Sequence, residues 1–233
     1  MPLFFIWGDK MAHSWWDLET RVGKGYKYIC GVDEVGWGAL CSSIVSAAVI
    51  LKPEAKELDI KDSKKLSQKK REELAKVIPD YCVSYSISEM DSVTIDEKGI
   101  QYCNMYVLDN AARKVCKDVE NCISIIDGRP LWKSNDFSYH FEEKADNLSR
   151  SVAAASIIAK VYRDNILIAL HEKYPEYNFA QNKGYGTKEH MEAIERFGII
   201  PGIHRTTFLN KFAYNWSAFF IPQNLMSLPT SSR

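Results

Sequence analysis

The stretch that decides the fold prediction lies at residues 28–38 and reads YICGVDEVGWG. It begins as a short apolar run, ends in the acidic pair Asp33 and Glu34, and continues into a turn that contains Gly36 and Gly38. A second apolar run covers residues 44–51 and stops just before a proline. Short apolar runs bounded by glycine and proline are typical of buried strands. We therefore predict two strands joined through a glycine loop.

Downstream of these strands, helical and strand-like patterns follow one another along the chain. Ser67 is placed to cap a helix that reaches about residue 78, because serine side chains accept hydrogen bonds from the first helical N–H groups. Strict alternation over 81–88 predicts a half-buried strand. The other predicted elements are an amphipathic helix over 100–115, a strand over 123–126, a long helix from about 150 to before Pro175, and a short helix between Thr187 and Gly198. This mixed order predicts an α/β or α+β fold around one sheet.

Composition excludes several classes of protein. The chain has 233 residues, 46% of them hydrophobic and 26% charged, which rules out a disordered chain, a collagen and a small disulfide scaffold. A chain of this length can bury one sizeable core. Thirty basic and thirty acidic residues give a net charge of zero, so any nucleic-acid contact must come from a local patch. The six cysteines contain no C-x-x-C pair, which favours reduced, mostly buried thiols in a cytosolic protein.

The two ends of the chain are expected to differ from its body. Residues 1–7 are apolar, but they are too few to span a membrane and lack the features of a signal peptide, so we expect a soluble, cytoplasmic protein. Residues 1–25 contain three of the six tryptophans and are expected to form an N-terminal extension packed on the body. We place the core at 26–175, a helical C-terminal part at 176–216 and a loosely held tail at 217–233.

Four acidic residues stand out by their position. Asp33 and Glu34 follow one apolar strand, Asp127 ends another, and Asp146 lies a few residues before the long helix. Carboxylates at the ends of buried strands point into the crevice where an open sheet holds its ligand. Grouped carboxylates repel one another, and a hard divalent cation such as Mg²⁺ or Mn²⁺ relieves that repulsion because oxygen ligands suit it. Two such ions about 4 Å apart can clamp a phosphate during hydrolysis.

Spacing alone leaves two interpretations of these acids open, a metal site or the ordinary capping of turns and helices. One geometric point weighs against the metal site. Adjacent residues of a regular strand face opposite ways, so Asp33 and Glu34 cannot both face one site unless the strand twists or ends there. The glycines at 36 and 38 favour such an ending.

Six stretches of the sequence together resemble a known family. They are GVDEVG at 31–36, DSKKL at 62–66, IDG at 126–128, SVAAASIIAK with the following Arg163-Asp164, GYGT at 184–187 with His190, and IHR at 203–205 with Phe208. In this order, over about residues 26–208, they are similar to the bacterial type 2 ribonucleases H (ribonuclease HII). The resemblance implies a ribonuclease H-like α/β fold, in which helices flank a mixed central sheet and a small helical part follows at the C-terminal end.

The activity that this resemblance implies is metal-dependent endonucleolytic cleavage of RNA within RNA–DNA hybrids. It includes cleavage at single ribonucleotides embedded in duplex DNA and leaves 3′-hydroxyl and 5′-phosphate ends. The residues that match the family's metal-binding carboxylates are Asp33, Glu34, Asp127 and Asp146, which would hold two Mg²⁺ or Mn²⁺ ions. They are the same four acids that their positions single out.

The resemblance also implies which residues contact the nucleic acid. They are Gly36, Trp37 and Gly38 at the ribose 2′-hydroxyl, Lys64 and Lys65 at phosphates, and Tyr185 against the sugar of the junction nucleotide. A structural alternative stays open for several of them: Tyr185 can be a core tyrosine in a glycine turn, and the basic run over 61–71 an ordinary solvated face. His204 and Arg205 can contact phosphates, support the metal ligands, or serve packing alone.

The glycine loop departs from the family pattern. Trp37 stands where the family has Arg or Lys, and Ala39, Ser42 and Ser43 stand where it has a proline and a Gly-Pro pair. The loop has therefore lost a cation beside the site. A tryptophan can instead stack on an exposed sugar or base, or pack against the tryptophan-rich N-terminal extension.

Three functions are compatible with this sequence. The first is an active type 2 ribonuclease H; the second is a catalytically impaired protein on the same fold that binds RNA–DNA hybrids; the third is a nuclease that cuts all-DNA duplex. We expect a monomer whose partner is nucleic acid and which does not bind a membrane. Binding to a sliding clamp is not expected, because residues 223–228 resemble a clamp-binding peptide but lack its terminal aromatic residue.

Overall fold

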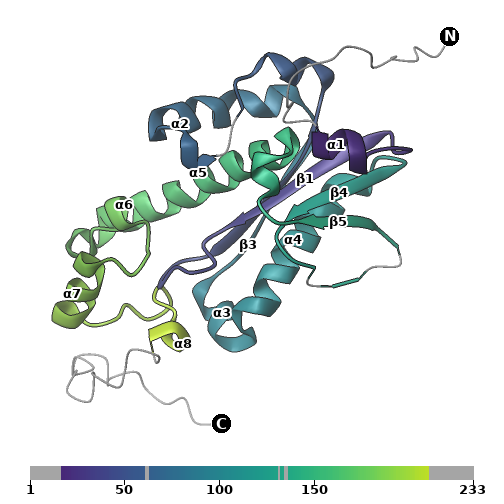
Figure 1. Ribbon diagram of the computed structural model, residues 1–233. Coiled ribbons are helices and arrows are strands. Elements are labelled where there is room, and N and C mark those ends of the chain that lie inside the picture. Colours follow the sequence, from purple (N-terminus) through teal and green to yellow (C-terminus); the bar gives the residue numbers. More distant parts are fainter. Residues whose placement is uncertain (1–16, 61–62, 131, 134–135, 210–233) are drawn as a thin grey trace.

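The computed structural model describes residues 17–60, 63–130, 132–133 and 136–209. Its centre is a five-stranded sheet in the order β3–β2–β1–β4–β5 (Figure 1). The strands are β1 (Tyr28–Val35), β2 (Ile44–Leu51), β3 (Cys82–Met90), β4 (Cys122–Asp127) and β5 (Ser138–Glu142). β1 pairs antiparallel with β2 and parallel with β4, while β2 and β3 are antiparallel and β4 and β5 parallel. This mixed sheet confirms the predicted fold class.

Helices cover both faces of the sheet. α5 (Arg150–Lys173) and α2 (Gln68–Val77) lie on one face, and α4 (Ile100–Cys116) lies on the other (Figure 1). Alternate residues of β2 serve the two sides: Val45, Ala47 and Val49 pack in the core beneath α5, and Ala48 and Ile50 in the core beneath α4. A strand that is buried on both faces has to be apolar along its whole length, which is why 44–51 reads as a continuous apolar run.

The remaining elements are short. They are α1 (Asp17–Val22), α3 (Ser92–Lys98), α6 (Phe179–Asn182), α7 (Lys188–Phe197) and α8 (Thr206–Leu209), with 3₁₀ turns η1 (Pro53–Glu57), η2 (Ser63–Lys65), η3 (Ile78–Tyr81), η4 (Ala145–Asn147) and η5 (Pro175–Tyr177). The predicted caps are confirmed, since the side chains of Ser67 and Thr187 accept hydrogen bonds from the first turns of α2 and α7. The sequence patterns did not predict α1, α3 or β5.

β3 is half-buried as predicted, but its apolar face is the more exposed one. Val83 and Tyr85 are 44% and 46% exposed. The serine face lies toward α4, where Ser86 Oγ donates to the Ala111 carbonyl at 2.7 Å and Ser88 Oγ accepts from Asn110 Nδ2 at 2.8 Å. The strand is an edge of the sheet, and hydrogen bonds to α4 offset the burial of its hydroxyl groups.

The helical C-terminal part packs on the far end of α5. Phe179, Ile194 and Leu209 form a core there with Leu167 of α5 and with Leu40, which follows the glycine loop. The Leu40 N–H donates to the Gly184 carbonyl at 2.8 Å, and the Arg205 N–H donates to the Leu40 carbonyl at 2.8 Å. The C-terminal part therefore lies directly beside the loop that follows β1.

The predicted N-terminal extension and tail are only partly visible. Within 1–25 the structure describes residues 17–25, and α1 packs on the body through Leu18. Residues 1–16, with their three tryptophans, and the tail at 217–233 lie outside the described residues, so the proposed domain limits stay predictions.

Five of the six cysteines are buried, as expected. Within the described part of the chain, no helix combines the length and the apolarity that crossing a membrane requires.

Candidate active site

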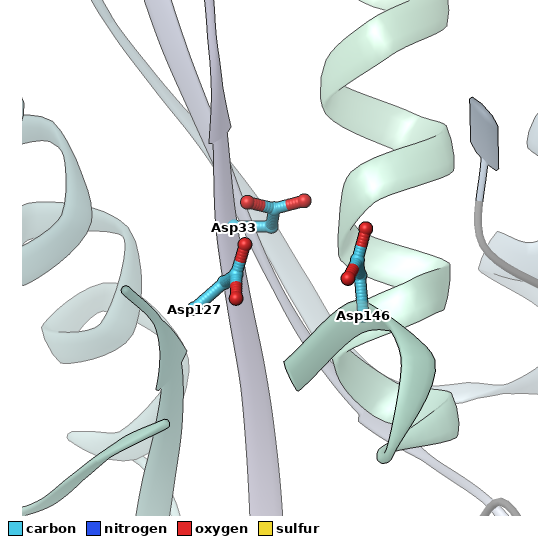
Figure 2. A group of neighbouring side chains, drawn as sticks. All are labelled: Asp33, Asp127 and Asp146. Atoms are coloured by element: carbon cyan, nitrogen blue, oxygen red, sulfur yellow. The ribbon is translucent and has the colours of Figure 1, made fainter. Parts of the chain in front are cut away.

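The site begins where two parallel strands end side by side. The pairing of β1 with β4 stops at Val32 and Ile126. The next residue on each strand is an aspartate, Asp33 on β1 and Asp127 on β4. The carboxyl ends of parallel strands lie at one edge of a sheet, which brings these two carboxylates together. Figure 2 shows their side chains next to each other.

The third carboxylate comes from the turn before the long helix. Asp146 lies in η4, and its side chain points from there toward the other two (Figure 2). Ligand atoms of Asp33, Asp127 and Asp146 all lie within 4.8 Å of one another. We call these three residues the acidic cluster. Among the described residues, no other set of three or more potential metal ligands is this compact.

Hydrogen bonds fix each member of the acidic cluster. The backbone N–H of Glu34 donates to Asp33 Oδ1 at 2.7 Å, and that of Ala145 donates to Asp127 Oδ1 at 2.7 Å. Asp146 is only 1% exposed and accepts from Asn147 Nδ2 at 2.9 Å and from Lys64 Nζ at 3.3 Å. The carboxylates are therefore held in place by the protein rather than splayed into solvent.

Glu34 faces the same pocket, although it does not belong to the acidic cluster. Its carboxylate interacts electrostatically with Asp127, Asp146 and Lys64, and it lines the same cavity as Asp33. β1 ends at Val35, one residue after Glu34, and its pairing with β4 has already ended at Val32. Both acids still pair with β2, Asp33 with Ala47 and Glu34 with Ser46, so the strand does not end between them, and only Asp33 belongs to the acidic cluster.

Burial and mutual repulsion make ionisation of these acids costly. Burial, and then the nearby charges of Glu34 and Asp127, raise the pKa of Asp33 well above its usual range. Burial and the charge of Asp127 raise the pKa of Glu34 to about 7, and burial and Asp146 also raise the pKa of Asp127. Compact, buried carboxylates of this kind fit a hard divalent cation, which favours their charged form and is bound by oxygen ligands.

Asp33, Glu34 and Asp127 line a cavity of about 310 Å³. Its lining also contains three cationic side chains, Lys64, Arg71 and Lys160, which we call the cationic wall. The hydroxyls of Ser63 and Ser156, the glycine loop at 36–38 and Tyr185 line the same cavity. Carboxylates that can hold a cation, together with cationic side chains, suit a phosphodiester because both would neutralise its charge.

Two buried arginines hold the glycine loop. Arg205 is fully buried and donates to the backbone carbonyls of Gly36, Trp37, Ala39 and Ser42 at 2.7–3.2 Å. Arg163 donates to the carbonyls of Cys41, Ser43 and Lys183. Gly36 has a φ of +101°, and a Cβ there would lie 2.5 Å from Arg163 Nε, so both the backbone conformation and the space require glycine.

The structure buries His204 and Arg205, for which the sequence left open phosphate contact, support of the metal ligands and packing. His204 is 1% exposed and Arg205 fully buried, so neither side chain is accessible to a nucleic-acid backbone. Arg205 donates to the loop carbonyls through Nε and Nη1, and the ring of His204 packs against His190. Of the alternatives drawn from the sequence, the structure supports a structural role for both.

A chain of hydrogen bonds runs from His204 to the backbone of Tyr185. His204 Nδ1 accepts from the Ile200 N–H at 2.8 Å, so in a neutral ring the proton is on Nε2. That proton faces His190 Nε2 at 3.2 Å, which places the proton of His190 on Nδ1, 2.9 Å from the Tyr185 carbonyl. Burial lowers the pKa of both histidines, to about 3 for His204, in keeping with neutral rings.

The other predicted contact residues lie at or near the cavity. Tyr185 and Trp37 line it, with Trp37 38% exposed at the rim. Lys64 lines the cavity and pairs with Asp146, whereas Lys65 points to Asn147 Oδ1 at 2.6 Å. Lys61 and Asp62 of the basic segment lie outside the described residues.

Sequence reasoning did not assign a role at the cavity to Ser156 or Lys160. Both lie on α5, four residues apart and thus on one helix face, and the Ser156 side chain hydrogen-bonds Asp33. A polar pair at this spacing inside a run of buried alanines and isoleucines was a signal for a functional face. Arg71 was counted only as part of a basic run, but it also holds the Ser63 and Leu66 carbonyls.

Comparison with known proteins gives one consistent family. The family model described as Ribonuclease HII matches residues 30–211. A ribonuclease HII of Clostridium perfringens is 49% identical over 189 residues, which cover 79% of this chain and 67% of the relative. The ribonuclease H2 crystal structure from Pyrococcus horikoshii OT3 is similar with a TM-score of 0.68 and 24% identity, covering 82% of this chain and 100% of that one. The RNase HII in a PCNA complex from Archaeoglobus fulgidus matches with a TM-score of 0.62 and 28% identity, over 76% and 93% of the two chains.

Proposed function

Because the chain belongs to the ribonuclease HII family, metal-dependent endonucleases that act on the RNA of RNA–DNA hybrids, we propose that it cuts at the acidic cluster with two divalent cations. We further propose that its substrates include single ribonucleotides embedded in duplex DNA, and that its products carry 3′-hydroxyl and 5′-phosphate ends. The cations would be Mg²⁺ or Mn²⁺, which take oxygen ligands.

The observation that carries this proposal is the convergence of Asp33, Asp127 and Asp146 within 4.8 Å, with Glu34 facing the same cavity. Bound cations would supply a nucleophilic water at neutral pH and stabilise the charge on the leaving oxygen. The three aspartates orient them, because backbone N–H groups already fix Asp33 and Asp127, and Asn147 fixes Asp146. Glu34 adds a fourth carboxylate at the same cavity, and bound cations would favour its charged form.

The cationic wall is proposed to position the phosphate backbone. Arg71 and Lys160 are held in place, since Arg71 donates to the Ser63 and Leu66 carbonyls and Lys160 Nζ to Asp164 Oδ1 at 2.7 Å. Lys64 is bound to Asp146 and is 77% exposed at its side chain, which leaves it room to meet a phosphate as well. Fixed cations position the substrate without the entropy loss of ordering flexible side chains.

The glycine loop and Tyr185 are proposed to distinguish ribose from deoxyribose. The 2′-hydroxyl is the group by which a protein tells RNA from DNA at one site. Arg205 donates hydrogen bonds to the carbonyls of Gly36, Trp37 and Ala39, so the glycine loop keeps a fixed shape beside the carboxylates. We propose that its N–H groups meet the 2′-hydroxyl and that the ring of Tyr185 packs on the neighbouring sugar.

The second candidate is a catalytically impaired protein that binds RNA–DNA hybrids. The observation behind it is Trp37, an uncharged, 38% exposed side chain that lines the cavity at a position where the family resemblance implies Arg or Lys. The presence of the full carboxylate set argues against it. The prediction that the chain does not bind a sliding clamp concerns residues 223–228, which lie outside the described residues. It stays a prediction, and the archaeal RNase HII named above was solved in complex with PCNA.

One assay separates the candidates. A DNA duplex that contains a single ribonucleotide, an RNA–DNA hybrid and an all-DNA duplex are each incubated with the protein and Mg²⁺ or Mn²⁺. We expect cleavage of the first two, with 3′-hydroxyl and 5′-phosphate ends, and none of the third. Binding without cleavage would support the impaired protein, and cleavage of all-DNA duplex would indicate a general DNA nuclease.

A further inference from the structure

Glu19 is a buried carboxylate outside the cavity, in a segment upstream of the residues that the family model matches. Glu19 is on α1, whereas the match begins at residue 30. Its side chain is 4% exposed. A buried carboxylate is costly unless hydrogen bonds compensate it, so its partners indicate what it does. Glu19 lies at the first turn of α5, where Figure 1 shows α1 beside the start of that helix.

Two hydrogen bonds of the Glu19 side chain end on a single oxygen. Glu19 Oε1 accepts from Ser149 Oγ at 2.6 Å and from the Ser151 N–H at 2.8 Å. Ser149 is itself the N-cap of α5 and accepts from the Val152 N–H. The free N–H groups of a helix start need acceptors, and here one acceptor comes from α1. Glu19 therefore ties α1 to the first turn of the helix.

That first turn follows directly on η4, which carries one member of the acidic cluster and holds a second. η4, with Asp146, ends two residues before Ser149, and its Ala145 N–H holds Asp127 Oδ1 at 2.7 Å. The Ser149 N–H in turn donates to the Ala145 carbonyl at 2.8 Å. Leu18, the neighbour of Glu19, packs in one core cluster with Ala145. A short path of direct contacts thus runs from α1 to two of the three aspartates.

The start of α5 also packs tightly against the sheet. An added Cβ at Gly31 would lie 2.0–2.5 Å from backbone atoms of Ser151 and Val152, so the helix start touches β1 directly, two residues before Asp33. β1 bounds the helix start on one side, and α1 holds it through Glu19. A shift of this turn would move Asp146 relative to Asp33.

We propose that Glu19 is a positioning residue for the catalytic metal site, which holds Asp127 and Asp146 in ligating geometry through the first turn of α5. The proposal rests on the proposed function of the acidic cluster. It assigns a role to α1, which the sequence patterns treated only as part of an extension. Residues that orient metal ligands without touching the metal typically contribute roughly 10- to 100-fold to metal affinity or activity.

The test compares Glu19→Ala with Glu19→Gln. Because one oxygen accepts from both Ser149 Oγ and the Ser151 N–H, the carbonyl oxygen of glutamine can replace it, and the amide can donate to the Ser151 hydroxyl, which hydrogen-bonds the carboxylate in the wild type. Mn²⁺ affinity is measured by isothermal titration calorimetry on the metal-free full-length protein, and kcat and KM are measured on an RNA–DNA hybrid. Val115→Ala, in the core beneath α4 on the other face of the sheet, serves as a control for general destabilisation.

For Glu19→Ala we expect Mn²⁺ affinity and kcat to fall roughly tenfold or more with KM little changed, and for Glu19→Gln we expect both within about threefold of wild type. If Glu19→Ala does not fold, Glu19→Asp, whose shorter side chain draws the oxygen back, should show the same loss in smaller measure. Mn²⁺ affinity equal to that of the Val115→Ala control would overturn the proposal. So would equal losses in the Ala and Gln variants, which would show that charge matters rather than position.

The two readouts separate this proposal from the proposed function. A wild-type protein that binds Mn²⁺ but cuts no hybrid would refute the proposed function, while the loss of Mn²⁺ affinity in Glu19→Ala would still support the role of Glu19. A wild-type protein that binds no Mn²⁺ would refute both.

Discussion

Replacing Glu34 by glutamine should stabilise the metal-free protein at alkaline pH. The carboxyl group is largely buried and lies near Asp127 and Asp146, and these surroundings raise its pKa from 4.5 to about 7. A group whose folded-state pKa is raised holds its proton more tightly in the folded protein than in the unfolded chain. Stability is therefore lost as the pH rises from about 4.5 to about 7, and the full penalty applies above pH 7. Glutamine has the same shape and never carries the charge.

The size of the effect follows from the pKa. A rise from 4.5 to about 7 corresponds to about 3 kcal/mol when the group is ionised in both states. For a chain of this length, each 1 kcal/mol shifts Tm by roughly 2–4 °C. Glu34→Gln should thus raise the Tm of the metal-free protein by roughly 6–12 °C at pH 8. At pH 5, where Glu34 is protonated in the folded protein, the two proteins should melt at nearly the same temperature.

The assay is thermal unfolding in EDTA at pH 5 and pH 8, followed by circular dichroism. Glu97→Gln, an exposed glutamate on α3, is the control and should leave Tm unchanged at both pH values. Adding Mn²⁺ at pH 8 should stabilise the wild type more than Glu34→Gln and so narrow the gap, because a ligand that binds the folded state stabilises it. A Tm difference that is the same at pH 5 and pH 8, or a less stable variant at pH 8, would refute the reasoning.

Three further changes test the walls of the cavity. Tyr185→Ala should reduce kcat/KM by roughly ten- to a hundredfold at a single ribonucleotide in DNA. The loss should be smaller on a long hybrid, because the hybrid can bind in several registers. Equal losses on the two substrates would indicate a purely structural role. Trp37→Arg should lower KM at low salt and steepen the plot of log binding constant against log salt concentration by roughly one unit. Fluorescence-anisotropy titrations measure this slope, and an unchanged slope would mean that the side chain does not face the nucleic acid. Arg205→Met removes the arginine donor from four backbone carbonyls and should cost about 4 kcal/mol or more in urea unfolding, since a buried polar group left unpaired costs roughly 1–3 kcal/mol. A loss below about 1 kcal/mol would contradict its role in the loop.

Much of the fold could be predicted because its signals are local. The apolar runs of β1, β2 and β4 and the caps Ser67 and Thr187 each depend on a few neighbouring residues, and all were correctly placed. β5 was missed because an edge strand of intermediate burial, Ser138–Glu142, has no apolar run of its own. α1 was missed because six residues are too short for a helical period to stand out.

The acidic cluster could be predicted only in part. Position at a strand end pointed to Asp33 and Asp127, but the compact approach of Asp146 depends on how η4 folds back, which no local pattern encodes. The same limit explains why the role of His204 and Arg205 could not be predicted. Polar residues in a segment with glycines are expected to be exposed, and only the tertiary structure shows that loop carbonyls and His190 surround these two. Buried polar networks are set by long-range contacts, and these are what a single sequence reveals least.

The central claim is that the acidic cluster performs metal-dependent cleavage of RNA in a hybrid. Its most direct test is to measure turnover and binding of one RNA–DNA hybrid by the wild type and by Asp127→Asn in Mg²⁺, with Asp118→Asn, an exposed aspartate after α4, as the matched control. Asparagine keeps the size of the side chain and removes one negative charge from the ligand set. We expect Asp127→Asn to lose turnover by orders of magnitude while its Kd for the hybrid stays close to wild type, because binding depends on phosphate contacts at the cationic wall. Turnover of Asp127→Asn equal to that of the wild type and of Asp118→Asn would contradict the claim.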